Sequence, residues 1–205
     1  MDWSSWWLAV GAASTSGINL YATVLTLGLL QRFQWLQLPE EWKLLGESWV
    51  LGLAGVLFLV EFVADKTPWV DSVWDTIHTF IRVPAGAVFM ASAFVNMDSA
   101  ARLAAGLLGG SLALTTHGAK ATTRLAVNSS PEPFSNIVLS LIEDVVTVFL
   151  LGLAATHPWL AALLLTLLLL VCLLIIRTLF KFTRLLLGRL RGWFGGKPAA
   201  SSLLK

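Results

Sequence analysis

The sequence predicts an all-α integral membrane protein with about six transmembrane helices. Apolar residues make up 57% of the 205-residue chain, and charged residues only 13%. Soluble domains have roughly 45–50% apolar and about 25% charged residues. Burying so much apolar surface requires a second apolar phase, which a bilayer provides. Long runs without a charged side chain are the second observation, because about 20 apolar residues in a helix cross the hydrocarbon core.

Six segments are predicted to span the bilayer. Two are long and contain no charged side chain, two are free of charge but short, and two are interrupted by charge. In chain order the six are 3–31, 48–64, 83–97, 103–119, 134–156 and 158–176. The first run follows Asp2 rather than a basic region, so it is not expected to be a cleavable signal peptide. We therefore expect a membrane domain over residues 1–180 and a basic tail over residues 181–205.

The basic residues predict the orientation, because Lys and Arg collect in cytoplasmic loops. The segment from residue 177 to the C-terminus is rich in both, so the C-terminus should be cytoplasmic. An even number of spans places the N-terminus on the same side. The same topology puts Lys66, Arg82, Lys120 and Arg124 in cytoplasmic loops. The tail is expected to form an interfacial amphipathic helix or a simple basic anchor, with residues 195–205 disordered.

Short internal matches predict a repeat. They occur in the same order along the chain and pair 15–19 with 116–120, 59–61 with 141–143, and 68–70 with 158–160. A repeat with three spans must enter the membrane from opposite sides in its two copies. The prediction is therefore two inverted-topology repeats, 5–97 and 99–180, with short or broken helices, a plan that many transporters share.

Two carboxylates interrupt the segment 134–156 near its centre. A charged side chain at mid-bilayer costs about 2.5–3.5 kcal/mol on insertion scales, so Glu143 and Asp144 need a reason to be there. Adjacent residues point about 100° apart on a helix, so one can face a central path and the other a neighbouring helix. Mutual repulsion predicts that one of them carries a proton. Alternatively, they form buried ion pairs with Lys120, Arg124 or Lys66 that lock the helices together.

A second polar stripe follows the second predicted span. Glu61 and Asp65 are four residues apart and share one helix face. The stripe continues at helical spacing through Asp71, Asp75, His78 and Arg82, with apolar residues on the other side. Residues 65–83 are expected either to lie on the cytoplasmic surface or to fold back and line a path.

The first predicted span contains a polar interruption at residues 14–19, which ends in Asn19. Small and hydroxylated residues let helices approach closely, which is one explanation. The other is a broken helix whose exposed backbone binds an ion.

No local signature of a catalytic or metal site is present. The three histidines form no paired spacing of metal ligands. A composite metal site of Glu61, Asp65, His78 and Glu143 is conceivable but not favoured. An intramembrane enzyme acting on a lipid head group would have to use Asp75 and His78. The expectation is therefore no enzyme, no cofactor and no metal, and the small net charge of +2 argues against nucleic acid as a partner.

Several blocks of the sequence resemble a known family. The blocks are 17–23 (GINLYAT), 61–66 (EFVADK), 68–71 (PWVD), 117–121 (HGAKA) and 130–136 (SPEPFSN). They are similar to a family of small bacterial membrane proteins known as the domain of unknown function 4126, over roughly residues 10–156. The resemblance implies a bacterial inner membrane protein, and it implies no activity.

The leading functional hypothesis is a channel or transporter for a small solute or ion, with a polar path lined by carboxylates. The residues expected to line this path are Glu61, Asp65, Lys66, Glu143, Asp144, Lys120, His117 and Asn19. The alternative is a scaffold or lipid-binding subunit that transports nothing and whose buried charges only pair helices. The expected partners are the lipid bilayer, an unidentified solute, ion or lipid, and further copies of the chain.

Overall fold

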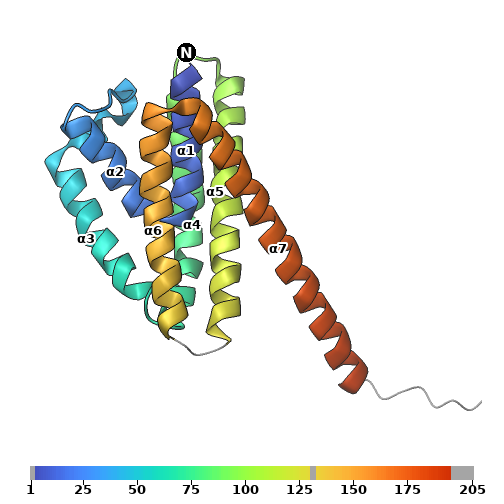
Figure 1. Ribbon diagram of the computed structural model, residues 1–205. Coiled ribbons are helices and arrows are strands. Elements are labelled where there is room, and N and C mark those ends of the chain that lie inside the picture. Colours follow the sequence, from blue (N-terminus) through green and yellow to red (C-terminus); the bar gives the residue numbers. More distant parts are fainter. Residues whose placement is uncertain (1–2, 130–132, 195–205) are drawn as a thin grey trace, which may run out of the picture.

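The computed structural model describes residues 3–129 and 133–194, and the regular structure of these residues is entirely helical. The elements are α1 (Trp3–Ile18), α2 (Leu20–Arg32), the 3-10 helix η1 (Glu40–Gly46), α3 (Ser48–Ala64), α4 (Val70–Ala93), α5 (Ser99–Asn128), α6 (Pro133–Thr156) and α7 (Pro158–Phe194). Helices α1, α4 and α5 pack together at the centre (Figure 1). Helices α2 and α3 lie on one side, and α7 diverges on the other. The predicted all-helical class is confirmed.

The chain breaks at Asn19, where the sequence predicted one uninterrupted span over 3–31. Asn19 has an extended backbone (φ −144°, ψ 102°), and its side chain accepts a hydrogen bond from the backbone N–H of Ala22. This is the geometry of a helix N-cap, for which asparagine is among the preferred residues. The prediction of one continuous helix was wrong, because a polar side chain can compete for the backbone within an apolar run. The alternative drawn from residues 14–19, a broken helix, agrees with this break.

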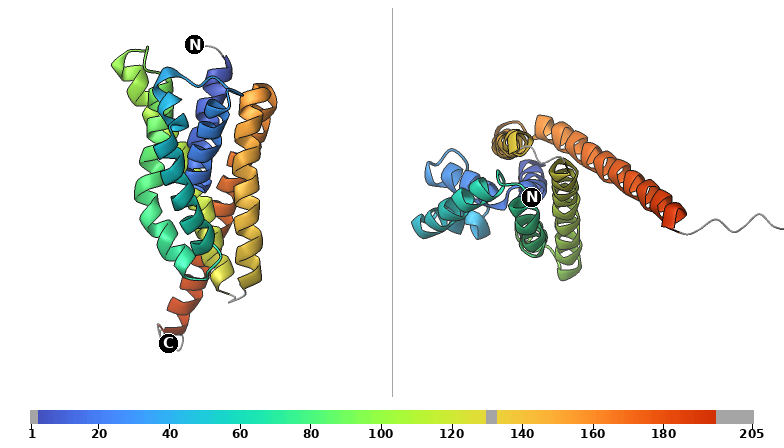
Figure 2. Two further views of the ribbon diagram at one scale, coloured as in Figure 1. Left: turned by 90° about the vertical axis from the view of Figure 1, so that its left-hand side faces the viewer. Right: turned by 90° about the horizontal axis from the view of Figure 1, so that it is seen from below.

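Helices α1 and α2 form a hairpin that returns to the end of the bundle from which it entered (Figures 1 and 2). Ser5 of α1, Leu38 after α2 and Asn96 after α4 line one cavity at that end. The far end of α7 lies at the opposite end of the bundle. The predicted topology, with both termini on one side, is therefore not supported, because residues 3–31 do not cross the bundle.

Two segments of the described chain are long and apolar enough to cross a membrane, Phe134–Thr156 in α6 and Pro158–Phe182 in α7. Helices η1 and α3, bent by 66° at their junction, would together make a third. The predicted count of six is not supported by this criterion. Helix α1 is too short, because the chain breaks at Asn19 and leaves it 16 residues long. Helices α4 and α5 are long enough, but their buried polar side chains lower their mean hydropathy.

The structure gives no support to the predicted inverted repeats. The match of 68–70 with 158–160 would make α4 and α7 equivalent. Helix α4 lies along α5, whereas α7 leaves the bundle after its first half (Figure 2). Helix α4 also joins two segments that the sequence divided near Pro84, which lies inside it. Gly86 and Gly109 allow α4 and α5 to touch along their backbones, since a Cβ on either residue would meet the other's carbonyl oxygen.

The 3-10 helix is fixed to α4 by Trp42, which is 3% exposed. Its indole N–H donates to the Ser92 hydroxyl at 2.7 Å, and its ring packs edge-to-face on Phe89. We expect Trp42→Phe to lower the free energy of unfolding by about 1 kcal/mol, because the ring is kept and one hydrogen bond is lost. Thermal unfolding of the detergent-solubilised protein measures this. Trp35→Phe is the control, because Trp35 is 78% exposed; equal shifts in the two variants would contradict the assignment.

Candidate functional site

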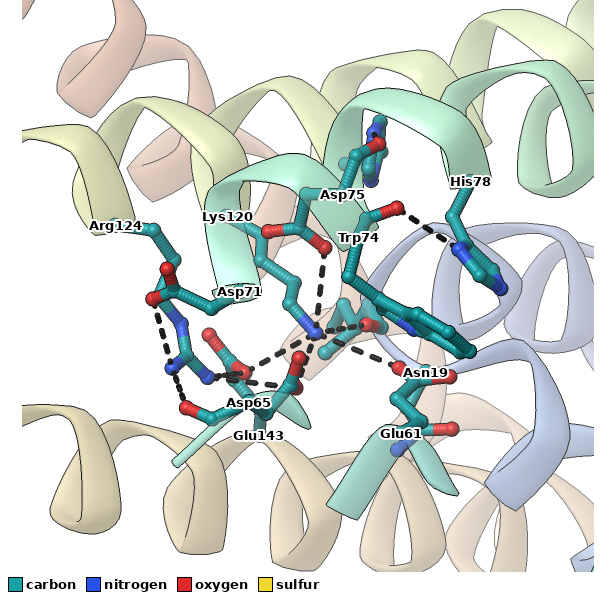
Figure 3. A network of polar contacts seen from close by, with 12 residues as sticks. Asn19, Glu61, Asp65, Asp71, Trp74, Asp75, His78, Lys120, Arg124 and Glu143 are labelled. Atoms are coloured by element: carbon teal, nitrogen blue, oxygen red, sulfur yellow. Dashed lines mark hydrogen bonds and ion pairs between the residues drawn. The ribbon is translucent and has the colours of Figure 1, made fainter. Parts of the chain in front are cut away.

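A cluster of buried, oppositely charged side chains lies between the helices of the described bundle, and Figure 3 shows most of it from close by. It joins α4 and α5 to the C-terminal end of α3 and the middle of α6. We call it the charge network, and its members are Glu61, Asp65, Asp71, Asp75, Arg82, Lys120, Arg124 and Glu143. All of these side chains except that of Glu143, which is 13% exposed, are at most 2% exposed.

Lys120 of α5 lies between carboxylates from three other parts of the chain. Its Nζ is 2.7 Å from Asp65 Oδ2, 3.4 Å from Glu143 Oε2 and 3.5 Å from Glu61 Oε1. Asp75 Oδ1 is slightly farther away, at 3.8 Å. The ammonium therefore connects α3, α4 and α6 to α5, and Figure 3 shows it reaching into their midst.

The two arginines extend the charge network on either side of Lys120. Arg82 donates to Glu61 at 2.5 Å and to Asp75 at 3.0 Å, and the same guanidinium lies 3.0 Å from Nδ1 of His117. Arg124 is 2.6 Å from Glu143 on the other side. Its remaining acidic partners are Asp65 at 3.4 Å and Asp71 at 3.6 Å. Each basic group thus has at least two carboxylate partners.

The charges of the network do not balance. Five carboxylates face three basic groups, which leaves two formal negative charges in excess if all the carboxylates are ionised. Several carboxylate oxygens are also buried without a hydrogen-bond partner, among them Glu61 Oε2, Asp65 Oδ1 and Asp75 Oδ2. Unpaired buried charge is costly, and it is relieved by taking up protons or a cation.

The helix break at Asn19 adjoins the network. Lys120 donates to the backbone carbonyl of Ile18 at 3.2 Å, so the cation lies at the C-terminal end of α1, where the helix dipole favours positive charge. The Asn19 amide donates to Asp144 at 2.8 Å. Gly17 permits the close approach of α1 to α5, because a Cβ there would collide with Thr116 and the backbone of Ala113. The broken helix therefore ends in the middle of the bundle, against charged side chains.

Most of the predicted path residues come together. Glu61, Asp65, Glu143 and Lys120 belong to the network, and His117 contacts it through Arg82. Asn19 and Asp144 form a neighbouring pair, so Glu143 and Asp144 take different partners. Among the described residues, Lys66 forms no direct ion pair with the network. Its ammonium donates to the Phe62 carbonyl and the Ser140 hydroxyl and lies over the Phe62 ring.

The stripe over residues 65–83 does not lie on a solvated surface. Its polar members Asp71, Asp75, His78 and Arg82 are at most 3% exposed. The opposite, apolar face of α4 is the exposed one, with Val73 at 62% and Phe80 at 80%. The spacing of the polar residues predicts that they share one helix face. Spacing alone does not show whether that face turns toward the protein interior or toward the outside.

The sequence-based topology misplaced three basic residues. Arg82, Lys120 and Arg124 were expected in cytoplasmic loops, and each is buried inside a helix. Arg82 and Arg124 were also missing from the expected path. Two asparagines that extend the network were not expected either. The Asn128 amide donates to Asp71 at 2.7 Å, and the Asn136 amide donates to Asn128 at 2.8 Å. These two asparagines stand near segment ends, where a polar residue gives no signal.

The residues considered for a composite metal site and for an enzyme site take separate partners. His78 contacts the Tyr21 hydroxyl and the Trp74 carbonyl, whereas Asp75 pairs with Arg82. Within residues 3–129 and 133–194, no group of three or more His, Cys, Asp and Glu side chains is arranged to hold a metal ion.

Comparison with known families finds one match. A family model described as a domain of unknown function (DUF4126) matches residues 7–178, a range that contains all five sequence blocks quoted above. Comparisons with curated proteins and with solved structures found no match.

Proposed function

We propose that this chain, which belongs to the DUF4126 family, is a membrane channel or transporter for a small solute or ion, with the charge network in its path. The observation that carries the proposal is the excess of two buried carboxylates beside a helix broken in mid-bundle. A buried excess of negative charge favours a positive occupant, either protons or a cation. An occupant that can leave again on either side of the membrane is transported.

Helix α4 supports a membrane setting. Its polar side chains are buried and its apolar ones exposed, which suits a helix surrounded by lipid and would be unfavourable in water. Broken helices whose ends meet a charged site at mid-membrane are a common feature of transporters. We place the chain in the inner membrane of a bacterium, with the basic end of α7 on the cytoplasmic side.

Flux into liposomes tests this proposal. We expect the purified protein to pass protons or a small cation faster than empty vesicles, and Glu143→Gln to lower that flux about tenfold or more, equivalent to about 1.4 kcal/mol in the barrier. Glu143 is suited to substitution because the network has carboxylates to spare, so Gln leaves no basic group without an acidic partner.

Glu40→Gln is the matched control, because Glu40 is exposed and pairs only with Lys43 outside the bundle. It should transport like the wild type. If no proton, sodium, potassium or small organic cation passes faster than through empty vesicles, transport is refuted.

The second candidate is a scaffold whose charges only hold helices together. It is favoured by the fact that every basic group of the network already has at least two carboxylate partners. The double variant Glu143→Gln/Asp144→Asn separates the two functions. A folded protein without flux supports the path, whereas loss of folded protein supports the scaffold.

A further inference from the structure

A cavity between α5, α6 and α7 leads to the charge network. It has a volume of about 210 Å³, and it occurs where α7 begins to leave the bundle. Most of its lining is apolar, including Leu139, Ile142, Val146 and Leu168. The charged groups in its wall are Lys120 and Glu143.

Glu143 is the point at which the network meets open space. Its side chain is 13% exposed, whereas the other acidic members of the network are at most 2% exposed. Lys120 is less available to a ligand, because four carboxylates already surround its ammonium. Glu143 is paired with Arg124 and Lys120 through Oε2 alone, so a ligand would meet its Oε1. An anion entering the cavity would meet a network that carries excess negative charge, whereas a cation would be attracted to it.

The lining indicates the rest of the ligand. A bare inorganic cation would lose its hydration against apolar walls without gaining new ligands there. A cation with an apolar body would bury that body in the cavity and present its charge to Glu143. The cavity volume of about 210 Å³ equals that of about seven water molecules, at roughly 30 Å³ each. A ligand with about that many non-hydrogen atoms therefore fits.

We propose that this cavity is a binding site for a small amphipathic organic cation, such as an alkylammonium, with its charge at Glu143 and its chain between α5, α6 and α7. The inference rests on the proposed transport function and deepens it, since it names the substrate class and a lateral route of entry.

Equilibrium binding of radiolabelled hexylammonium to the purified full chain tests the site. Hexanol and hexanoate share its chain and differ in the head group, so they serve as competitors. We expect hexylammonium to bind saturably, and hexanoate to compete at least about tenfold less well than unlabelled hexylammonium. Glu143→Gln should weaken binding about tenfold or more. Equal competition by all three compounds, or stronger competition by hexanoate, would overturn the proposal.

A second variant keeps the test decisive if Glu143→Gln fails to fold. Ile142 lines the cavity and is 53% exposed, so Ile142→Trp can narrow the entrance without entering the core. It should weaken binding, whereas the same change at Val145, which is 66% exposed and absent from the cavity lining, should not. A protein that passes protons but binds no hexylammonium refutes this site alone. A protein that binds hexylammonium but passes nothing refutes transport alone.

Discussion

Arg82→Met is expected to destabilise the folded protein by about 3–5 kcal/mol, the usual cost of removing one partner from a buried ion pair. Arg82 is fully buried and pairs with both Glu61 and Asp75. Methionine fills much of the same volume but leaves these carboxylates with only the more distant Lys120, at 3.5 Å and 3.8 Å. The excess of buried negative charge grows from two to three. Thermal unfolding and size-exclusion profiles in detergent measure the loss.

Two further variants show whether charge is the cause. Arg102→Met removes an exposed arginine of α5 and should change stability by no more than about 0.5 kcal/mol. Adding Glu61→Gln to Arg82→Met removes one of the stranded carboxylates, so the double variant should regain at least about 1 kcal/mol over the single one. If the double variant is the less stable of the two, Arg82 acts through packing and not through charge.

This imbalance also explains why the effects of the network substitutions should differ. Removing an acid reduces the excess charge, whereas removing a base increases it. Glu143→Gln is therefore expected to leave the protein folded and to act on flux, while Arg82→Met acts on folding. A network that only held helices together would show the same asymmetry in stability, so the flux of Glu143→Gln is the measurement that separates the two functions.

The sequence predicted the helical class and the family, and it singled out most of the acidic side chains of the network. These inferences succeeded because composition and the rarity of intramembrane charge are local properties of the chain. The position of Glu143 in an apolar run was informative whatever its partners were. The polar stripe through Asp71, Asp75 and Arg82 likewise identified the residues of one helix face.

The topology could not be predicted in the same way. The span over 3–31 failed because Asn19 caps a new helix in mid-bundle, and only the packing of α1 against α5 explains why the chain can turn back there. Arg82 and Arg124 were assigned to loops because basic residues usually mark loops. Their burial depends on carboxylates far away in the sequence. The alternative of buried ion pairs named Arg124 as a partner for Glu143, whereas the pairing of Arg82 with Glu61 was not expected.

The helix break itself is expected to depend on Gly17. A Cβ at this position would collide with the Thr116 hydroxyl and with the carbonyl of Ala113, so Gly17→Ala must push α1 away from α5. Such overpacking costs about 1–3 kcal/mol. The displacement also pulls the Ile18 carbonyl from Lys120, and the Ser14 carbonyl from the Thr116 hydroxyl that donates to it at 2.8 Å. Thermal unfolding in detergent measures the loss of stability.

Gly52→Ala on α3 is the matched control, because a Cβ there meets no atom within 4 Å. Alanine is the better helix former by about 0.8–1.0 kcal/mol, so this variant should be as stable as the wild type or more stable. If Gly17→Ala behaves in the same way, α1 does not need its close approach to α5. If Gly17→Ala is destabilised as expected but keeps full flux in liposomes, the break at Asn19 serves folding alone, and the transport path must run through the network without it.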